Sequence, residues 1–185
     1  MSERIKLLRR QLGLSLQSLA DSSGLTKSYL SKVERGVCVP SIAAALKIAA
    51  TLKVDVAQLF SREVSRDMVA VVRHDERLNI QRDSAAEGSG LEAIAAKVER
   101  KRMLPFVVSP PQQFADGPQL SGHAGEEFLF VLKGRVEIAF PERTELLMVG
   151  DAIYFNALVP HRLRSVGNSR ASALVVISAG EDRNV

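Results

Sequence analysis

Residues 24–36, GLTKSYLSKVERG, constrain the fold more than any other stretch of the chain. The hydroxyl of Thr26 can cap a helix by accepting hydrogen bonds from backbone N–H groups of the first turn. Leu30 and Val33, three residues apart, share one apolar face, and Gly36 suits the left-handed backbone that often ends a helix. The outer face then carries Lys27, Ser28, Ser31 and Lys32. The pattern predicts a short helix that fits a DNA major groove, although an ordinary surface helix fits it too.

The neighbouring segments predict a bundle of five short helices within residues 4–60. Ser15 can cap the second helix, Pro40 and Ser41 can open the fourth, and Asp55 can cap the last. A three-residue turn at residues 22–24 separates the second helix from the third, as in a helix-turn-helix. The inner side of the first helix is marked by apolar side chains at helical spacing, at Ile5, Leu8 and Leu12.

The basic excess of the chain is confined to its first third. Residues 1–60 hold nine Lys and Arg against four Asp and Glu, a net charge of +5. The remaining residues hold sixteen against seventeen, a net charge of −1, which accounts for the total of +4. This distribution indicates a module that binds a polyanion, attached to a nearly neutral partner domain.

Composition excludes several classes of protein. Hydrophobic residues make up 46% and charged residues 25%, as in a soluble globular protein. No run approaches the roughly 18 to 20 apolar residues of a membrane span, and the N-terminus lacks the apolar core of a signal peptide. We therefore expect a cytoplasmic protein with no membrane partner. The single cysteine, Cys38, excludes an intrachain disulfide and is expected to pack as a small residue rather than to sense redox state.

The N-terminal segment resembles the XRE-type (lambda repressor-like) helix-turn-helix domain. The resemblance covers about sixty residues and rests on the following stretches: residues 14–20 (LSLQSLA), 24–36, Pro40-Ser41 and 46–49 (LKIA). It implies that the helix from Thr26 to Arg35 enters the major groove of DNA. One position departs from the family pattern. Many members begin the second helix with a Gln that contacts the DNA backbone, whereas this chain has Leu16 there and Gln17 one position later.

The resemblance also implies a role for each polar residue of the recognition helix. Lys27, Ser28 and Lys32 are expected to contact bases or phosphates, and Thr26 and Ser31 to contact phosphates. Arg35 is expected to contact the DNA backbone while also supporting the fold. Glu34 is expected to pair with a basic neighbour inside the domain.

Residues 61–67 shift to mixed charge and are interpreted as a linker between residues 1–60 and a second domain, residues 68–185. Seven short runs rich in β-branched and aromatic residues follow it, at residues 68–72, 91–95, 106–108, 128–132, 136–140, 152–155 and 173–177. Turn residues separate these runs. Many short strands at close spacing predict an all-β sandwich or barrel. His74, after the first run and among charges, is expected at the surface.

Two stretches resemble the motifs of the cupin family, a double-stranded β-helix or jelly-roll barrel. The first is GHAGEE at residues 122–127, followed by six residues and then Gly134, and the second is GDAIYF at residues 150–155, followed by Pro160, His161 and Asn168. The agreement covers roughly residues 105–178. An XRE domain followed by a cupin is the arrangement of a recognised family of regulators, and the whole chain resembles a member of it.

The cupin resemblance implies a metal site inside the barrel, with His123, Glu127 and His161 as ligands. Ser121 occupies the position of a fourth ligand and departs from the pattern. Two imidazoles and a carboxylate can still hold zinc or another divalent first-row transition metal. The alternative is that these polar side chains line an effector pocket or satisfy one another inside the barrel.

A pocket for a small effector is expected around the same residues, Ser121 included. Alternation along a strand puts Leu129 and Val131 on the face of Glu127, and Leu163 on the face of His161. An aliphatic lining beside two His and a Glu suits a small polar metabolite with an apolar part. Arg162 and Arg164 fall on the strand face opposite His161, so we exclude them from the pocket. Phe128 and Phe130 fall on the face opposite Glu127 and are available to an inter-subunit sheet.

The leading hypothesis is a transcription regulator, favoured as a repressor on family grounds. A homodimer, joined through the cupin, would read two half-sites of a palindromic operator about 10 bp apart or a multiple of that. A small-molecule effector would shift the population of DNA-competent dimers. The alternatives are a metal-dependent cupin enzyme of dioxygenase or isomerase type and, more weakly, an adaptor that binds protein through its N-terminal domain.

Overall fold

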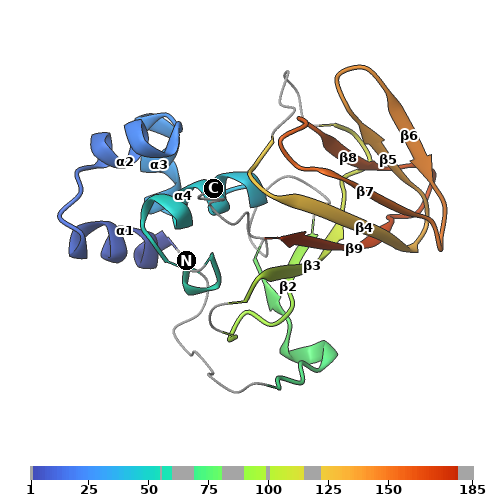
Figure 1. Cartoon of the computed structure of the whole chain (residues 1–185), viewed down its shortest axis with the longest axis horizontal. Coiled ribbons are helices and arrows are strands. Elements are labelled where there is room, and N and C mark those ends of the chain that lie inside the picture. Colours follow the sequence, from blue (N-terminus) through green and yellow to red (C-terminus); the bar gives the residue numbers. More distant parts are fainter. Residues whose placement is uncertain are drawn as a thin grey trace, which may run out of the picture. The chain divides into compact units, whose positions relative to one another are not determined.

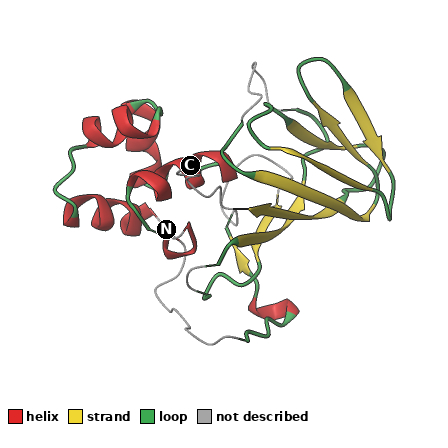
Figure 2. Cartoon of the chain, viewed as in Figure 1, coloured by secondary structure: helices red, strands yellow, loops and turns green. Residues whose placement is uncertain are grey.

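The structure is a computed structural model that describes residues 2–54, 56–59, 69–80, 90–98, 101–114 and 122–178 (Figure 2). The chain divides into two compact units, Met1–Val71 with Ala96–Arg100, and Val72–Ala95 with Lys101–Val185. The predicted linker, residues 61–67, lies outside the described residues. Within the described part of the chain, no helix is long and apolar enough to cross a membrane.

The first unit is helical (Figure 1). Its elements are α1 (Ser2–Gln11), α2 (Leu16–Ser23), α3 (Lys27–Glu34), α4 (Ile42–Thr51) and the 3₁₀ helix η1 (Val56–Leu59). Ser15, Thr26 and Ser41 each cap the following helix, and each side-chain oxygen accepts a hydrogen bond from a backbone N–H three residues later. Gly24 ends α2 in the left-handed region, with φ of 65°, which a residue with a Cβ rarely adopts. These local signals set the helix boundaries.

The helices pack around a core of large aliphatic side chains. Fully buried members come from every element of the unit: Ile5, Leu19, Leu30, Val33, Ile48 and Leu59. Small residues allow close helix packing, and three consecutive alanines at the start of α4, residues 43–45, are all buried. α2 contacts both α3 and α4, so the helix-turn-helix pair rests on the fourth helix.

Two details of the predicted bundle are wrong. Four α-helices are present in the described residues rather than five, because the expected last helix is the single 3₁₀ turn η1, and its predicted cap, Asp55, lies outside them. Leu12 does not extend the buried stripe of α1. The helix ends at Gln11, Gly13 follows with φ of 67°, and Leu12 is 49% exposed. The left-handed glycine ends the periodicity before Leu12 can turn inward.

The second unit is built from two antiparallel sheets (Figure 1). The six-stranded sheet has the order β1-β2-β3-β9-β4-β7, and the three-stranded sheet has the order β6-β5-β8. The strands are β1 (Leu78–Asn79), β2 (Gly90–Ala93), β3 (Met103–Ser109), β4 (Glu126–Lys133), β5 (Val136–Ala139), β6 (Thr144–Leu147), β7 (Ala152–Asn156), β8 (Arg162–Ser165) and β9 (Ser172–Ser178). A 3₁₀ turn, η2 (His74–Glu76), precedes β1, and His74 is exposed as predicted.

Strand alternation separates a buried face from an outer face. On β4, Leu129 and Val131 are fully buried, and on β9 Ala173, Val175 and Ile177 are at most 1% exposed. The register pairs Leu129 with Val175, so the inner faces of both strands build one core. Gly134, in the turn between β4 and β5, has φ of 72°, and a Cβ there would lie 3.0 Å from Cα of Ala171. The turn therefore needs glycine for both backbone conformation and space.

Six of the seven predicted strand runs coincide with strands. The run at residues 68–72 does not: Met68 lies outside the described residues, and residues 69–72 form no strand, with Val69 81% exposed. An apolar run becomes a strand only when a partner strand and a buried face are available. The seven predicted runs do not include β1, β6 or β8, although the alternation expected around Leu163 agrees with β8. β1 has two residues, β6 begins with the consecutive polar residues Thr144 and Glu145, and β8 contains only one apolar residue, Leu163, so the apolar signal of each is weak.

Candidate DNA-binding helix and candidate metal centre

The candidate recognition helix α3 is capped at both ends. Oγ1 of Thr26 accepts a hydrogen bond from the backbone N–H of Tyr29 at 3.2 Å. At the other end, Nε of Arg35 donates to the carbonyl of Ser31 at 3.2 Å, so the guanidinium folds back along its own helix. Leu30 and Val33 are fully buried and fasten the inner face of α3 to the core. The helix is therefore a rigid element with one side free.

The residues predicted to contact DNA lie on that free side or at its ends. Thr26, Lys27, Ser28, Lys32 and Arg35 are exposed, and Ser31 is half-buried. Their individual roles toward bases and phosphates stay predictions. The exposed face carries three cations and hydroxyl groups but no carboxylate, which suits a polyanion.

A buried ion pair fixes α3 to α1. Nε and Nη2 of Arg9 donate to the two carboxylate oxygens of Glu34 at 2.6 and 2.9 Å, and Nη1 donates to the carbonyl of Leu14 at 2.7 Å. The two side chains are only 11% and 7% exposed. The prediction that Glu34 pairs with a basic neighbour is confirmed, and the partner is Arg9. Sequence patterns could not single out Arg9, because several basic residues on α1 were available.

The start of α2 also differs from the pattern of many related domains. Leu16 is half-buried, and the amide of Gln17 donates to Asp21 within the same helix at 2.8 Å. Gln17 is exposed, but its side chain is engaged along α2. These contacts give no reason to assign Gln17 the DNA contact that the pattern places one position earlier.

Three predicted metal ligands converge in the second unit. His123 precedes β4, Glu127 lies on β4 and His161 precedes β8. Oε2 of Glu127 lies 3.1 Å from Nε2 of His123 and 3.4 Å from Nε2 of His161. His123 and Glu127 are buried, and the ligand atoms of all three residues lie within 4.8 Å of one another. We call this group the His–Glu–His cluster. Ser121, the departing fourth position, lies outside the described residues.

Backbone carbonyls orient both imidazole rings. Nδ1 of His123 lies 3.1 Å from the carbonyl of Ala124, and Nδ1 of His161 lies 2.9 Å from the carbonyl of Val159. A carbonyl only accepts, so each Nδ1 is assigned the N–H, and each Nε2 is directed at Glu127. When both rings are neutral, their Nε2 lone pairs and the Glu127 carboxylate oxygen are thus available to one metal ion. This donor set fits a divalent transition metal, because fixed tautomers and one carboxylate are what such a site requires.

The cluster also shifts the protonation equilibria of its members. Burial alone would raise the pKa of Glu127, but hydrogen bonds with His123 and His161 and their charge outweigh it and lower the pKa. Burial alone would lower the pKa of His161, but the hydrogen bond with Glu127, its negative charge and the carbonyl of Val159 raise it. The protein therefore stabilises a carboxylate beside a protonated imidazole when no metal is present.

The three aliphatic residues predicted to line the effector pocket are buried or paired within the sheets. Leu129 and Val131 share the inner face of β4 with Glu127 but have no exposed surface. Leu163 is half-buried on β8 and pairs with Ile138 of β5. Arg162 and Arg164 lie on the opposite face of β8, within 4.0 and 5.0 Å of the ring centre of Phe114, and Arg164 forms an ion pair with Glu137. The effector role of Leu129, Val131 and Leu163 stays a prediction.

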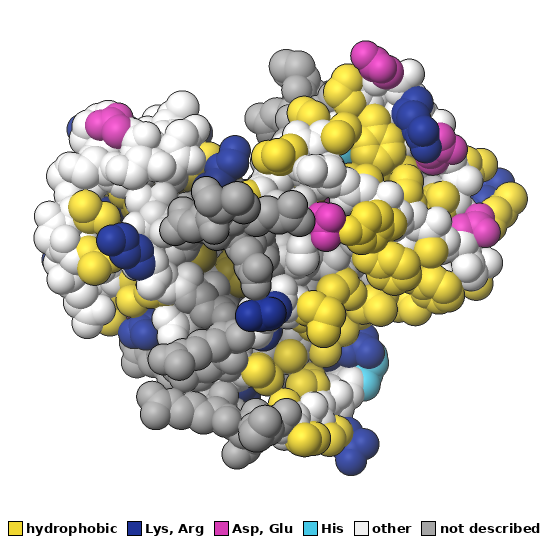
Figure 3. Space-filling view, in the orientation of Figure 1, with side chains coloured by type: hydrophobic (Ala, Val, Ile, Leu, Met, Phe, Trp, Pro, Cys, Tyr) yellow, Lys and Arg dark blue, Asp and Glu magenta, His cyan; other side chains and the backbone are white. Residues whose placement is uncertain are grey.

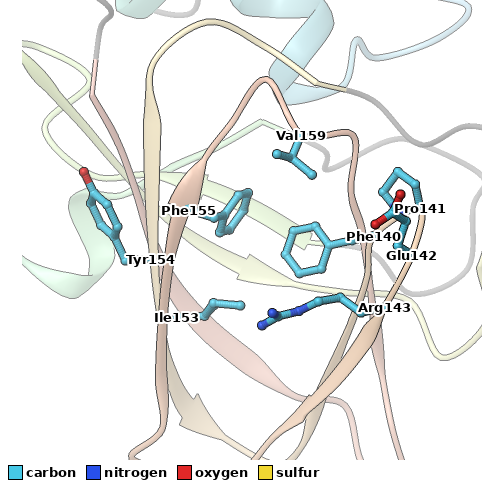
Figure 4. A pocket seen from close by; sticks show the side chains of 8 residues that line it. All are labelled: Phe140, Pro141, Glu142, Arg143, Ile153, Tyr154, Phe155 and Val159. Carbon is cyan, nitrogen blue, oxygen red and sulfur yellow. The ribbon is translucent and has the colours of Figure 1, made fainter.

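A cavity of about 460 Å³ lies beside the cluster (Figure 4). It is lined by Phe140, Pro141, Glu142, Arg143, Ile153, Tyr154, Phe155 and Val159. The ring centroid of Phe155 lies 4.8 Å from that of His161 and 5.2 Å from that of Phe140. None of these residues was predicted from the sequence as part of a pocket. Alternation along β7 could have shown that Ile153 and Phe155 share a face, but Phe140 joins them only through the tertiary fold.

The two units define a class of protein: a helix-turn-helix domain followed by a cupin with a His–Glu–His group that could hold a metal. Comparison with known families agrees. The helix-turn-helix family matches residues 5–59, and the cupin domain family matches residues 106–177. The chain belongs to the XRE-type helix-turn-helix transcriptional regulators that carry a C-terminal cupin domain. It is a DNA-binding transcription regulator with a cupin sensor domain.

Several curated regulators are similar to this chain. PuuR of Escherichia coli (strain K12) is 26% identical over 181 residues, covering 96% of this chain and 92% of PuuR. SinR of Bacillus subtilis (strain 168) is 32% identical over 108 residues, covering 58% of this chain and 88% of SinR. SlrR of the same strain is 48% identical over 60 residues, and the chain spans only 40% of its length. All three are named HTH-type transcriptional regulators.

Solved structures support the two-domain fold. An HTH_3 family transcriptional regulator from Vibrio cholerae superposes with a TM-score of 0.66 at 23% identity, covering 97% of this chain and 95% of that one. The Fe(II) form of HppE superposes with a TM-score of 0.50 at 22% identity, covering 96% and 97%. At these identities the likeness concerns the fold alone.

Proposed function

We propose that the protein is a homodimeric repressor that reads a palindromic operator through α3 and responds to a small molecule bound in its cupin. The observation that carries the proposal is the exposed face of α3, with Lys27 and Lys32 on a helix that Leu30, Val33 and the Arg9–Glu34 pair hold rigid. A helix fixed in this way can present side chains to base edges and phosphates without further ordering.

The outer face of the six-stranded sheet supports the homodimer. The register aligns Pro105, Val176, Phe128 and Tyr154 in a row across β3, β9, β4 and β7. Phe128 is 37% exposed and Tyr154 62% exposed, and Figure 3 shows hydrophobic side chains gathered over this unit. An exposed apolar sheet face of this kind is typical of a subunit interface. A twofold dimer would present two copies of α3 to two half-sites.

The His–Glu–His cluster supports a sensor site, with Ser121, Leu129, Val131 and Leu163 as its further predicted members. His123, Glu127 and His161 would hold zinc or another first-row transition metal, which would supply a Lewis-acidic centre for an effector to coordinate. The chain's own contribution is to orient the two imidazoles through backbone carbonyls and to keep the carboxylate buried.

A second candidate function, a metal-dependent cupin enzyme, is favoured by one observation. Two histidines and one carboxylate form the ligand set of many non-haem iron oxygenases. We propose regulation without catalysis, because the similar curated proteins are named as regulators. Metal analysis of the purified protein separates the two: stoichiometric iron with oxygen-dependent turnover would establish the enzyme.

DNA binding is tested with the variants Lys27→Ala and Lys32→Ala. Duplexes selected from a random pool by the purified full chain serve as the operator, and fluorescence anisotropy measures Kd at several salt concentrations. Each lost phosphate contact should weaken binding and reduce the slope of log K against log salt by about one. Lys133→Ala, an exposed lysine on β4, is the matched control. Unchanged affinity and slope in both α3 variants would remove α3 from the interface.

A further inference from the structure

The cavity beside the cluster lies between strand β7 of the six-stranded sheet and the turn that joins β5 to β6 in the three-stranded sheet. Among the described strands, β7 ends the six-stranded sheet and β6 ends the three-stranded sheet. The turn between β5 and β6 is closed by a hydrogen bond from the backbone N–H of Phe140 to the carbonyl of Arg143 at 2.8 Å. This turn forms one wall of the cavity and β7 forms the other. The cavity therefore has a rigid strand on one side and a closed turn on the other.

The walls of the cavity are mainly apolar and aromatic. Ile153 and Phe155 point to the inner face of β7, because they pair with the inward residues Leu129 and Glu127. The rings of Phe140 and Phe155 meet edge to face, at an interplanar angle of 81°. A volume of about 460 Å³ with such walls suits a small molecule that has a compact apolar body.

One cation extends across these walls. Figure 4 shows the guanidinium of Arg143 reaching toward Ile153, whereas the carboxylate of Glu142 stays beside Pro141. Nη2 of Arg143 lies 3.0 Å from Oε1 of Glu145, with side chains 67% and 41% exposed. An ion pair this exposed is weak, so a ligand carboxylate can replace Glu145 as the partner of the guanidinium at little cost.

We propose that this cavity binds a monocarboxylate with a compact aromatic or branched apolar body. The apolar body packs against Phe140, Phe155 and Ile153, and the carboxylate pairs with Arg143. The inference rests on the proposed function, since it names the chemical class of the effector. Because Phe155 contacts both the cavity and the ring of His161, an occupant lies one aromatic ring away from the His–Glu–His cluster.

The test uses three probes that share one phenyl group and differ in charge: phenylacetate, 2-phenylethylamine and benzyl alcohol. Isothermal titration calorimetry on the purified full chain measures Kd for each, with EDTA and then with added zinc. We expect phenylacetate to bind at least about fivefold more tightly than the amine, because the guanidinium of Arg143 extends across the cavity whereas the carboxylate of Glu142 stays beside Pro141. Equal or tighter binding of the amine, or no binding of phenylacetate in either condition, overturns the proposal.

Two substitutions with opposite expected effects sharpen the test. Arg143→Gln should weaken phenylacetate binding about fivefold and leave benzyl alcohol unchanged, since only the charged contact is lost. Glu145→Gln should strengthen phenylacetate binding, because it removes the competing carboxylate. Arg170→Gln, an exposed arginine outside the cavity, is the control. If Arg143→Gln and Glu145→Gln both bind phenylacetate as the unsubstituted chain does, Arg143 is not the anchor and the proposal fails.

The outcome for the ligand is separable from the outcome for regulation. Anisotropy with the selected duplex measures DNA binding independently of calorimetry. Phenylacetate binding that leaves DNA affinity unchanged would refute the effector-responsive function but keep the carboxylate site. DNA binding with no carboxylate binding would refute the site but keep the DNA-binding function.

Discussion

Separating Arg9 from Glu34 should destabilise the helical unit far more than the loss of a surface ion pair. The pair joins α1 to α3 through two parallel hydrogen bonds at 2.6 and 2.9 Å, and Arg9 makes a third bond to the carbonyl of Leu14. Both side chains are almost fully buried. The informative set of variants is Arg9→Met, Glu34→Gln and the double variant, which keep side-chain volume nearly constant.

The expected magnitudes follow from which charge is left behind. Removing one member of a buried pair costs about 3–5 kcal/mol, and the slight exposure here favours the lower end, about 3 kcal/mol for Arg9→Met. Glu34→Gln keeps an acceptor oxygen and the Arg9–Leu14 bond, so about 1.5 kcal/mol is expected. The double variant leaves no unpaired charge and should cost about 3 kcal/mol, below the sum of the single costs by about 1.5 kcal/mol.

The assay must report on one unit of a two-unit chain, for which a single unfolding transition is not assured. Hydrogen exchange with mass spectrometry on the full chain meets this need, because peptides from α1 and α3 report local opening. A loss of 3 kcal/mol raises exchange through global opening of the unit about a hundredfold, at 1.4 kcal/mol per tenfold. Peptides from β4 provide an internal control and should be unchanged.

Additivity would contradict this reasoning. If the double variant costs as much as the two single variants together, the two residues act independently and the observed geometry does not couple them. A cost below about 1 kcal/mol for Arg9→Met would mean that the pair behaves like an exposed one. In that case α3 would owe its position to Leu30 and Val33 rather than to the ion pair.

Three further predictions concern the cupin unit. The pKa of His161 is raised in the folded protein, so its contribution to stability is complete below the ordinary pKa of 6.5 and is lost as pH rises through the raised pKa. The pKa of Glu127 is lowered, so its contribution is complete above the ordinary pKa of 4.5 and is lost as pH falls through the lowered pKa. Thermal melts with EDTA should therefore peak between these limits, and a melting temperature that climbs on the alkaline side would contradict this sign. Glu127→Ala should abolish stabilisation by zinc and the effector response while leaving ligand-free DNA binding intact, as measured by thermal shift and anisotropy; a retained response would put the sensor site elsewhere. Gly134→Ala should destabilise the unit by about 1–3 kcal/mol, because alanine is strained at this positive φ and its Cβ would approach Ala171. Hydrogen exchange of β4 and β5 peptides measures this loss. Gly13→Ala, at a similar φ but with open space around it, is the control and should destabilise its own unit less.

Local signals allowed most of the helical unit to be predicted. Helix starts could be predicted at Ser15, Thr26 and Ser41, because a capping side chain acts on backbone N–H groups only two or three residues away. The errors arose where tertiary structure decides. Leu12 has the right spacing for the stripe of α1, but the left-handed Gly13 ends the helix first. The identity of the partner of Glu34 depends on how α1 crosses α3, which no local pattern contains.

In the candidate site, too, residues within motifs of fixed spacing were predicted, whereas residues brought together only by the tertiary fold were not. His123, Glu127 and His161 were predicted together because the cupin motifs keep their spacing, and the structure brings them within reach of one metal. The cavity was not predicted because its walls, the turn between β5 and β6 and the strand β7, come together only in the folded chain. Phe140 directly follows β5 and Phe155 lies on β7, and nothing between them in sequence relates the two positions.

Glu127 and Phe128 are consecutive residues of β4, with side chains on opposite faces of the sheet. The buried cluster and the exposed apolar row are therefore separated by a single peptide unit. A rotation or shift of β4 that follows a change at Glu127 moves the backbone that carries Phe128 as well. A displacement that begins at the cluster therefore has only one strand, β4, to cross before it reaches the outer surface of the cupin.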